Sequence, residues 1–354
     1  MAALRFGYVG AGFVAQGVHI PHFAKMPDVE LVALAELRPK LGAMVQQRYG
    51  FRKLYRNHME IANDPEIEAV GVSAYFTEQS TIARDLLRAG KHVFMEKPMA
   101  VSVAEAEEML EAERAGGGRL MVAYMKRYDS GNETAKRWLD EIRASGELGD
   151  IFYARNHGFC GRNWTAGFDA TFLKSDEPRP EAPPLRGPDW MPSDLYGKYI
   201  SYLQQYAHNV NLLRWFLDAG EDLKVVSVDL DEDAYIGTVN LRVGGVRAVI
   251  ESGVSSHFGW DEHTQIYFRH GYVKVTCPPL LLRNSPAGIE IYKGDGIQQT
   301  IVPQPDDPYT FSYEREAQHF VKCLQTGEAF RSTGRDTLAD VKAFEDIFKV
   351  YLKL

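Results

Sequence analysis

The stretch LRFGYVGAGFVA, residues 4–15, decides the fold of the first part of the chain. Its apolar start is typical of a buried strand, and Gly10 and Gly12 predict a tight turn directly after it. The small residue Ala15 allows the helix that follows to pack closely on the strand. Strand, turn and helix in this order aim backbone N–H groups at a point where a pyrophosphate can bind. The residues expected to contact a dinucleotide here are Gly10, Gly12, Phe13 and Val14.

Short apolar runs and helical patterns alternate over the first 125 residues. Repeated strand–helix units predict a parallel sheet with helices on both faces, and right-handed crossovers make it doubly wound. We therefore expect a Rossmann dinucleotide-binding domain over residues 1–125. Its further strands are predicted at residues 29–35, 69–73, 92–95 and 120–123, and two of its helices at 80–89 and 103–115.

Glu36 and Arg38 follow the second predicted strand and bear on the choice between NAD and NADP. An acid at this place bonds the ribose hydroxyls and repels a 2′-phosphate, whereas an arginine can hold that phosphate. Glu36 favours NAD as the cofactor, and Arg38 keeps NADP as the less favoured alternative.

The pattern changes after residue 125. A helix is expected over 132–144, a strand over 151–155, a long loop over 158–198 and a helix over 199–217. Period-two alternation then predicts several strands joined by tight turns, which form a large open antiparallel sheet. These strands are expected at residues 224–230, 234–243, 246–256, 264–269, 272–276 and 288–292.

This second region is expected to be an α/β domain for substrate binding and oligomerisation, over residues 126–335. The remaining residues, 336–354, are expected to form a C-terminal helix that packs back on the body of the protein.

The composition of the 354 residues excludes several classes of protein. Apolar residues make up 45% and charged residues 25%, so the chain is neither disordered nor a coiled coil. A net charge of −8 offers a nucleic acid no general attraction, and no apolar run approaches the length of a membrane span. The N-terminus lacks a secretory pattern, and the three cysteines form neither a disulfide framework nor a zinc pattern. We expect a cytoplasmic protein without a metal site, a nucleic-acid partner or a membrane contact.

The segment HVFMEKP, residues 92–98, resembles the Glu-Lys-Pro motif of the Gfo/Idh/MocA oxidoreductases, a family that includes glucose–fructose oxidoreductase and inositol dehydrogenases. The resemblance covers nearly the whole chain. It implies a Rossmann domain followed by an α/β domain with an open antiparallel sheet. It also implies hydride transfer between nicotinamide and a carbon that bears a hydroxyl, usually on a sugar or polyol. Further matching stretches are residues 10–15, 89–92, 125–128, 208–215 and 331–336.

Lys97 and His208 are the catalytic residues that the resemblance implies. Oxidation of a secondary alcohol needs one group that takes the hydroxyl proton and one that stabilises charge on the oxygen. A histidine suits the first role, and a lysine at the carboxyl end of a parallel strand suits the second. Taken alone, Lys97 could be an ordinary loop lysine and His208 a buried histidine satisfied by its neighbours. Glu96 and Lys97 are also expected to contact the cofactor.

Gln204, His208, Asn211 and Trp215 recur at spacings that place them on one face of the predicted helix. A polar stripe of this kind can bind sugar hydroxyls. Many family members carry aspartate where this chain has Gln204 and Asn211, so the chain departs here from a plain inositol or glucose dehydrogenase.

Other candidate contacts come from loops and from the domain junction. Ala74 and Tyr75 replace a frequent Thr-Pro segment, and the ring of Tyr75 either stacks on the cofactor or packs in the core. Arg127 is expected to contact the cofactor. Aromatic planes and hydrogen-bonding side chains suit a sugar, whereas tryptophans otherwise pack and arginines otherwise face solvent. The residues expected to contact the substrate are Lys97, Tyr128, Asn156, Arg162, Trp164, Gln204, His208 and Asn211.

Three functions remain open at this point. The first is an NAD-dependent dehydrogenase or reductase acting on a secondary alcohol carbon of a sugar, glycoside or polyol. The second is an NAD-dependent glycosidase that oxidises C3 transiently, eliminates the aglycone and returns the hydride with tightly held NAD. The third is a non-enzymatic ligand sensor, against which Lys97 and His208 argue. An open sheet with an uncovered face also predicts a homodimer or homotetramer.

Overall fold

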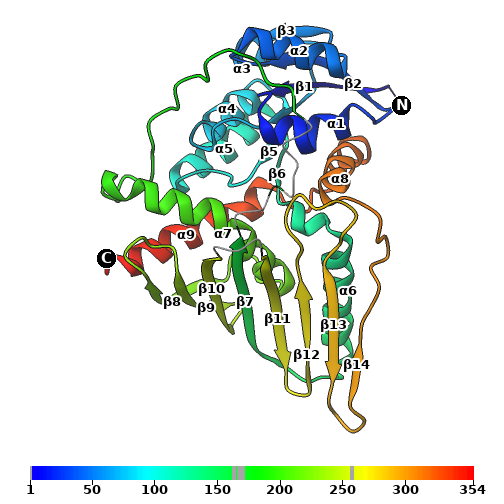
Figure 1. The fold of residues 1–354 in the computed structure, drawn as a ribbon, viewed down its shortest axis with the longest axis vertical. Helices are drawn as coiled ribbons and strands as arrows, with labels where there is room; N and C mark the ends of the chain where they lie inside the picture. The colour runs from blue at the N-terminus through cyan, green and yellow to red at the C-terminus, as the bar shows by residue number, and fades with distance from the viewer. Residues whose placement is uncertain (1, 162–164, 166–171, 256–258) are drawn as a thin grey trace. The chain divides into compact units, whose positions relative to one another are not determined.

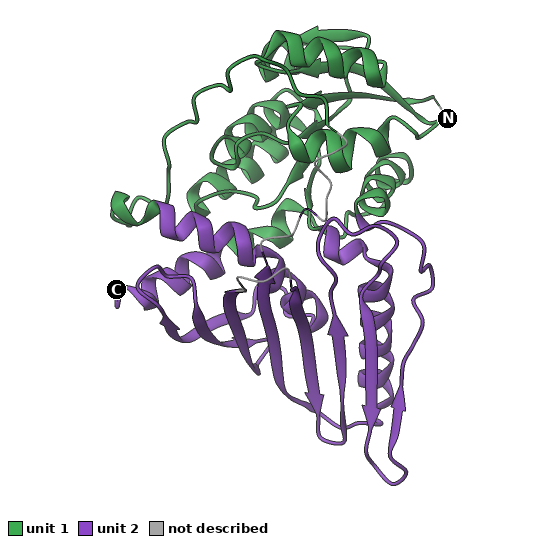
Figure 2. Ribbon diagram, viewed as in Figure 1, with its two compact units in different colours: residues 1–124, 168–196, 313–341 green, residues 125–167, 197–312, 342–354 purple. Residues whose placement is uncertain are grey.

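The computed structural model describes residues 2–161, 165, 172–255 and 259–354. The chain divides into two compact units, which Figure 2 colours separately. Unit 1 comprises residues 1–124, 168–196 and 313–341, and unit 2 comprises residues 125–167, 197–312 and 342–354. Two segments that the sequence analysis assigns to the second domain, 168–196 and 313–335, thus pack with unit 1. In the described part of the chain, no helix is both long and apolar enough to cross a membrane.

Unit 1 is built on a six-stranded parallel sheet in the order β3-β2-β1-β4-β5-β6. The chain winds outward from β1 in both directions, since β1 pairs with both β2 and β4. This order confirms the doubly wound Rossmann fold, and Figure 1 shows its helices around the sheet. The strands are β1 (Leu4–Val9), β2 (Val29–Ala35), β3 (Lys53–Tyr55), β4 (Ala69–Val72), β5 (His92–Glu96) and β6 (Leu120–Ala123). The helices are the π-helical turn Ala15–His19, α1 (Ile20–Phe23), α2 (Pro39–Tyr49), α3 (His58–Ala62), α4 (Phe76–Arg88), α5 (Val103–Gly116), α8 (Ser312–Thr326) and the start of α9 (Gly334–Tyr351).

A cluster of buried phenylalanines holds α8 in unit 1. The ring of Phe320 in α8 lies 5.5 Å from that of Phe94 in β5, measured between centroids. Phe6 of β1 stacks on Phe23 of α1 at 4.2 Å. Each of these rings is fully buried and contributes on the order of 2 kcal/mol of hydrophobic free energy. Apolar contact therefore explains why a segment from the end of the chain completes the first domain.

Unit 2 is built on an eight-stranded sheet in the order β14-β13-β12-β11-β7-β10-β9-β8. The sheet is mostly antiparallel, as predicted, but β7 and β10 run parallel, so it is mixed. Helix α6 packs on β12 and β13 (Figure 1). The strands are β7 (Ile151–Gly161), β8 (Leu223–Leu230), β9 (Gly237–Val243), β10 (Val246–Ser255), β11 (Asp261–Phe268), β12 (Gly271–Thr276), β13 (Gly288–Lys293) and β14 (Gln299–Ile301). The helices are the 3-10 turn Met125–Tyr128, α6 (Ser130–Ser145), α7 (Tyr196–Phe216) and the end of α9.

The strand β7 runs well beyond its predicted end at Arg155. Both neighbours, β10 and β11, pair with it past that residue, and their ladder hydrogen bonds support a stretch that is poor in β-branched residues. Asn156 consequently lies inside a strand and not in the loop that the sequence analysis expects. The short strands β3 and β14 escape prediction because three residues are too few to show a period.

Candidate cofactor and catalytic site

The glycine turn after β1 has the backbone that the sequence predicts. Gly10 adopts a φ of +94°, and a Cβ there would lie 2.2 Å from the carbonyl oxygen of Ser73. Only glycine fits at this position. At Gly12, by contrast, a Cβ would have no atom within 4 Å. This open space, next to the start of a helix, fits the close approach of a pyrophosphate.

Residues of the long segment 172–196 lie directly against this turn. Gln16 donates from Nε2 to the carbonyl oxygens of Ala11 and Leu173, at 2.8 and 3.2 Å, and accepts from the Leu173 amide at 3.0 Å. Phe13 packs on Phe172, with ring centroids 4.4 Å apart. The segment is therefore fastened to the helix that opens after the turn.

Glu36 and Arg38 form an ion pair at the end of β2. Glu36 is buried, and its Oε2 accepts from the Ala11 amide of the glycine turn at 2.7 Å. Its Oε1 accepts from Nε of Arg38 at 2.7 Å. The carboxylate thus lies beside the turn, where an acid can meet the ribose, and it already neutralises the arginine that could hold a 2′-phosphate.

Glu96 ends β5 and Lys97 follows it, at the same edge of the parallel sheet as the glycine turn. Glu96 accepts from the Lys97 amide through Oε2, at 3.1 Å. Its Oε1 lies 2.7 Å from Nε2 of His19, a fully buried residue on the helical segment after the turn. The side-chain nitrogen Nε2 of Gln79 donates to the backbone carbonyl oxygen of Glu96 at 3.5 Å. The residue before Lys97 is therefore fixed by both side chain and backbone.

A second acid, Glu316 of α8, lies fully buried next to this pair. Its Oε1 is 4.0 Å from Nδ1 of His19, and neither of its carboxyl oxygens has a hydrogen-bond partner among the described residues. Burial, and secondarily the charge of Glu96, raise the pKa of Glu316 well above its ordinary value. Burial likewise raises the pKa of Tyr8 and of Tyr313. Glu316 is thus a buried acid beside His19 whose protonated form is favoured by its surroundings.

Ala74 and Tyr75 follow β4 at the same sheet edge. The side chain of Tyr75 is 43% exposed, so the alternative of core packing is wrong. Its hydroxyl donates to the carbonyl oxygen of Pro180 at 3.3 Å, and its exposed ring is a candidate surface for stacking on the cofactor.

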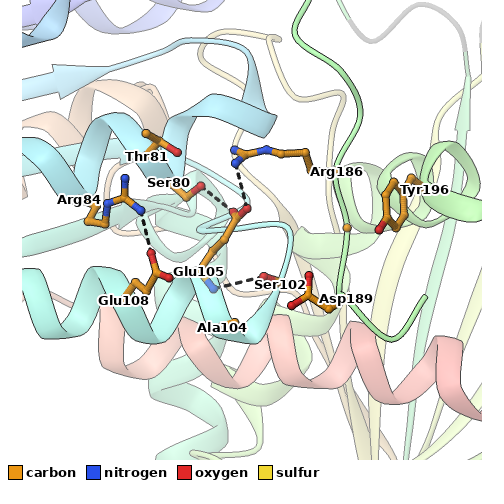
Figure 3. A pocket seen from close by; sticks show the side chains of 11 residues that line it. Ser80, Thr81, Arg84, Ser102, Ala104, Glu105, Glu108, Arg186, Asp189 and Tyr196 are labelled. Carbon is orange, nitrogen blue, oxygen red and sulfur yellow. Dashed lines mark hydrogen bonds and ion pairs between the residues drawn. The ribbon is translucent and has the colours of Figure 1, made fainter. Parts of the chain in front are cut away.

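Unit 1 also contains a polar pocket of about 370 Å³ at the start of α4 and α5 (Figure 3). Arg84 pairs with Glu108 at 2.7 Å, and Arg186 lies 3.6 Å from Glu105. Ser80 donates to Glu105 at 2.7 Å. None of the predicted site residues lines this pocket, and each of its two arginines is paired with a glutamate.

In unit 2, Arg127 and Asn211 come together. Nε of Arg127 donates to Oδ1 of Asn211 at 2.7 Å, and both side chains are buried. His208, one turn earlier on α7, is 4% exposed, whereas Gln204 is exposed. Tyr128 is buried at the end of its 3-10 turn. The stripe predicted on α7 therefore runs from an exposed to a buried environment.

Asn156 is fully buried in unit 2, and its amide is engaged there. It donates to Thr264 and accepts from Asn209, each at 2.7 Å. Asn209 also reaches Glu262, which forms a buried ion pair with Lys126. These contacts give Asn156 a structural role in a polar network that the sequence did not indicate.

Arg162 and Trp164, two of the predicted substrate contacts, lie outside the described residues. Within the described ranges, no group of three or more histidine, cysteine or acidic side chains is arranged to hold a metal ion.

Comparison with known proteins decides the family. Residues 4–124 match the family described as "Oxidoreductase family, NAD-binding Rossmann fold", the Gfo/Idh/MocA family. Residues 4–124 thus belong to the Gfo/Idh/MocA oxidoreductases. Its first unit is accordingly an NAD-binding Rossmann domain.

Relatives of this chain match it over most of its length. An inositol 2-dehydrogenase from Salmonella typhimurium is 25% identical over 283 residues, covering 77% of this chain and 74% of that protein. An aldose–aldose oxidoreductase from Caulobacter crescentus, complexed with glycerol, has a TM-score of 0.73 at 19% identity and covers 99% of this chain and 98% of its own. A levoglucosan dehydrogenase, complexed with NADH and levoglucosan, also has a TM-score of 0.73, at 17% identity, covering 99% of this chain and 98% of its own. These two structures share the fold of this chain.

The side chains around the Glu-Lys-Pro motif include several that the sequence analysis missed. The sequence could have indicated His19, because a histidine in the first turns of the dinucleotide helix lies near the strand ends. Nothing in the sequence indicates Glu316, since it lies on a helix near the end of the chain, far from the motif in sequence. Nor does the sequence indicate that Glu177 contacts the start of α2.

Proposed function

We propose that this Gfo/Idh/MocA oxidoreductase transfers a hydride between NAD and a secondary alcohol carbon of a sugar or polyol, with Lys97 and His208 as its catalytic residues. The observation that carries the proposal is the position of Lys97, directly after β5 at the sheet edge that also holds the glycine turn. Ligands of open parallel sheets bind at this edge. The relatives point to the substrate class, since one is an inositol dehydrogenase and another a levoglucosan dehydrogenase.

The chain must supply what the cofactor does not. When bound, NAD carries the hydride. The ammonium group of Lys97 stabilises negative charge on the substrate oxygen, and His208 takes or returns the hydroxyl proton. Glu96 holds the Lys97 backbone through its hydrogen bond to the amide, and it belongs to the cofactor contacts of the proposal.

The remaining contacts stay part of the proposal. Tyr75 offers an exposed ring to the cofactor, and Arg127 holds Asn211 in place. Gln204 is exposed on α7 and is proposed as a substrate contact together with Tyr128, Asn211, Arg162 and Trp164.

We also propose a homodimer or homotetramer. One face of the unit 2 sheet carries half-buried side chains such as Tyr153, Tyr267 and Tyr292, whereas the alternate residues are buried. A second copy can cover this face. Light scattering that shows a stable monomer at micromolar concentration contradicts this part.

The activity is tested with the purified chain, NAD and a panel of inositols, aldoses and glycosides, followed by NADH absorbance. Lys97→Ala and His208→Ala are each expected to lower kcat by at least about a hundredfold on a substrate so identified. Lys224→Ala and His270→Ala change the same residue types at exposed positions and serve as controls. Full turnover by both Lys97→Ala and His208→Ala contradicts the proposed roles.

A further inference from the structure

The segment 172–187, which we call the strap, follows the carboxyl edge of the unit 1 sheet. It contacts Gln16 after β1, the start of α2 after β2, and Tyr75 after β4. Farther along, Arg186 reaches the Thr77 carbonyl oxygen and lies 3.6 Å from Glu105 at the start of α5. Figure 1 shows the strap in green, and Figure 3 shows Arg186 pointing toward α5. Because carboxyl ends of parallel strands share one edge, the strap runs along the edge where dinucleotides bind.

Glu177 of the strap occupies the N-terminus of α2. Its Oε1 accepts from the amide of Lys40 at 3.0 Å, and its Oε2 accepts from the amide of Leu41 at 2.9 Å. Amides in the first turn of a helix have no partner within the helix, so a carboxylate here satisfies two of them at once. Ser175 donates a further hydrogen bond to Oε2 at 2.9 Å.

The neighbouring residue Asp176 engages the side chain of the same lysine. Nζ of Lys40 lies 2.9 Å from Oδ1 and 3.2 Å from Oδ2 of Asp176. Although desolvation alone would raise it, the hydrogen bonds from the Lys40 and Leu41 amides hold the pKa of Glu177 below its ordinary value. Glu177 is therefore anionic at neutral pH.

This place matters because an NADP site uses positive groups just after the second strand to hold the 2′-phosphate. Three such groups follow β2 in this chain: Arg38, Lys40 and the amides that open α2. Each is already matched by a carboxylate of the protein, from Glu36, Asp176 and Glu177 respectively. A 2′-phosphate would meet three negative charges and no unmatched positive group among these.

We propose that Glu177, supported by Asp176, determines the cofactor specificity of this protein by occupying the anion position at the N-terminus of α2 that the 2′-phosphate of NADP needs. The ribose hydroxyls of NAD carry no charge and do not compete for these positive groups. The strap therefore keeps its contacts with the start of α2 when NAD is bound. This inference rests on the NAD-binding part of the proposed function and does not depend on the alcohol that is oxidised.

The test is the ratio of dissociation constants for NADP and NAD, measured by calorimetry on the full chain. The variants are Glu177→Gln, Glu177→Ala and the double variant Asp176→Asn/Glu177→Gln. The control is Glu181→Gln, which removes the same charge from an exposed strap position four residues further on. We expect the double variant to bind NADP at least about tenfold more tightly than the control does, because like charges facing a phosphate are strongly unfavourable. Its affinity for NAD should change by less than about threefold.

Two results would overturn the proposal. One is an unchanged ratio in all three variants. The other is an equal loss of affinity for both dinucleotides, which would mean that Glu177 only holds the strap in place and does not select the cofactor. These are binding measurements, so a failure to find sugar turnover would contradict the proposed activity and leave this test intact.

Discussion

Nε2 of His19 lies 2.7 Å from Oε1 of Glu96, although the two residues are 77 positions apart. The contact joins the helical segment after the glycine turn to the residue before Lys97. The second carboxyl oxygen of Glu96 accepts a hydrogen bond from the Lys97 amide. One carboxylate therefore links the cofactor turn to the proposed catalytic loop. The position of Lys97 is consequently set by the same helix that begins at the dinucleotide turn.

Removal of His19 should weaken both stability and turnover. His19→Ala leaves Glu96 with one partner fewer in a mostly buried place, so the free energy of unfolding should fall by about 1–3 kcal/mol. Because the Lys97 loop loses its support, kcat should fall more than KM rises. His19→Gln can donate again and should recover part of both. Urea unfolding and steady-state kinetics measure the effects, and a His19→Ala variant equal to the wild type contradicts this account.

The two glycines of the turn should respond differently to alanine. Gly10→Ala forces a side chain into a positive φ and against the Ser73 carbonyl, and should cost more than about 2 kcal/mol of stability. Gly12→Ala meets no protein atom, so stability should change by less than about 1 kcal/mol. Its methyl group projects instead into the space assigned to the pyrophosphate, and the Kd for NAD should rise by at least about tenfold. Unchanged NAD binding by Gly12→Ala would contradict the proposal that the dinucleotide binds at this turn.

Glu316 should make stability depend on pH. Its raised pKa means that the folded chain binds more protons than the unfolded chain at pH values above about 4.5. The free energy of unfolding therefore falls as the pH rises from there toward the folded-state pKa. Glu316→Gln has no proton to lose and should be more stable than the wild type near pH 8, and about equal to it near pH 4. Urea unfolding across this range decides; a difference independent of pH would show that Glu316 does not titrate as described.

The buried pair of Lys126 and Glu262 should be costly to break on one side. Lys126→Met leaves a carboxylate buried without its cation, and the expected loss is about 3–5 kcal/mol. The double variant Lys126→Met/Glu262→Gln removes both charges and should lose less than the single one. Thermal and urea unfolding of the four proteins in this cycle give the coupling energy. A loss in the double variant that equals the sum of the two single-variant losses would mean that the two charges do not interact.

Much of the fold follows from patterns that are local in sequence. The strands β1, β2 and β6 fall where the apolar runs predict them, because burial on both faces of a parallel sheet demands such runs. Gly10 is similarly local, since the tight turn needs a positive φ at that residue. The dinucleotide domain and the place of Lys97 at a strand end were therefore predictable.

Other features depend on neighbours that the sequence does not reveal. The end of β7 is a strand because β10 and β11 pair with it, and Asn156 is thereby buried in a polar network instead of lying in a loop. The parallel pairing of β7 with β10 inside a mostly antiparallel sheet is likewise a matter of topology.

The amino-acid sequence by itself thus determined the Rossmann domain, the glycine turn, Glu36 and the Glu-Lys-Pro strand end, since each is specified by residues within a few positions of one another. Only the tertiary structure decided which distant groups meet them: His19 at Glu96, Glu316 at His19, and Glu177 on the α2 amides, 137 positions from Lys40. The physical reason is that strand and turn formation respond to local periodicity and backbone freedom. Pairing of buried or anionic side chains, by contrast, depends on the path by which the chain returns to the sheet edge.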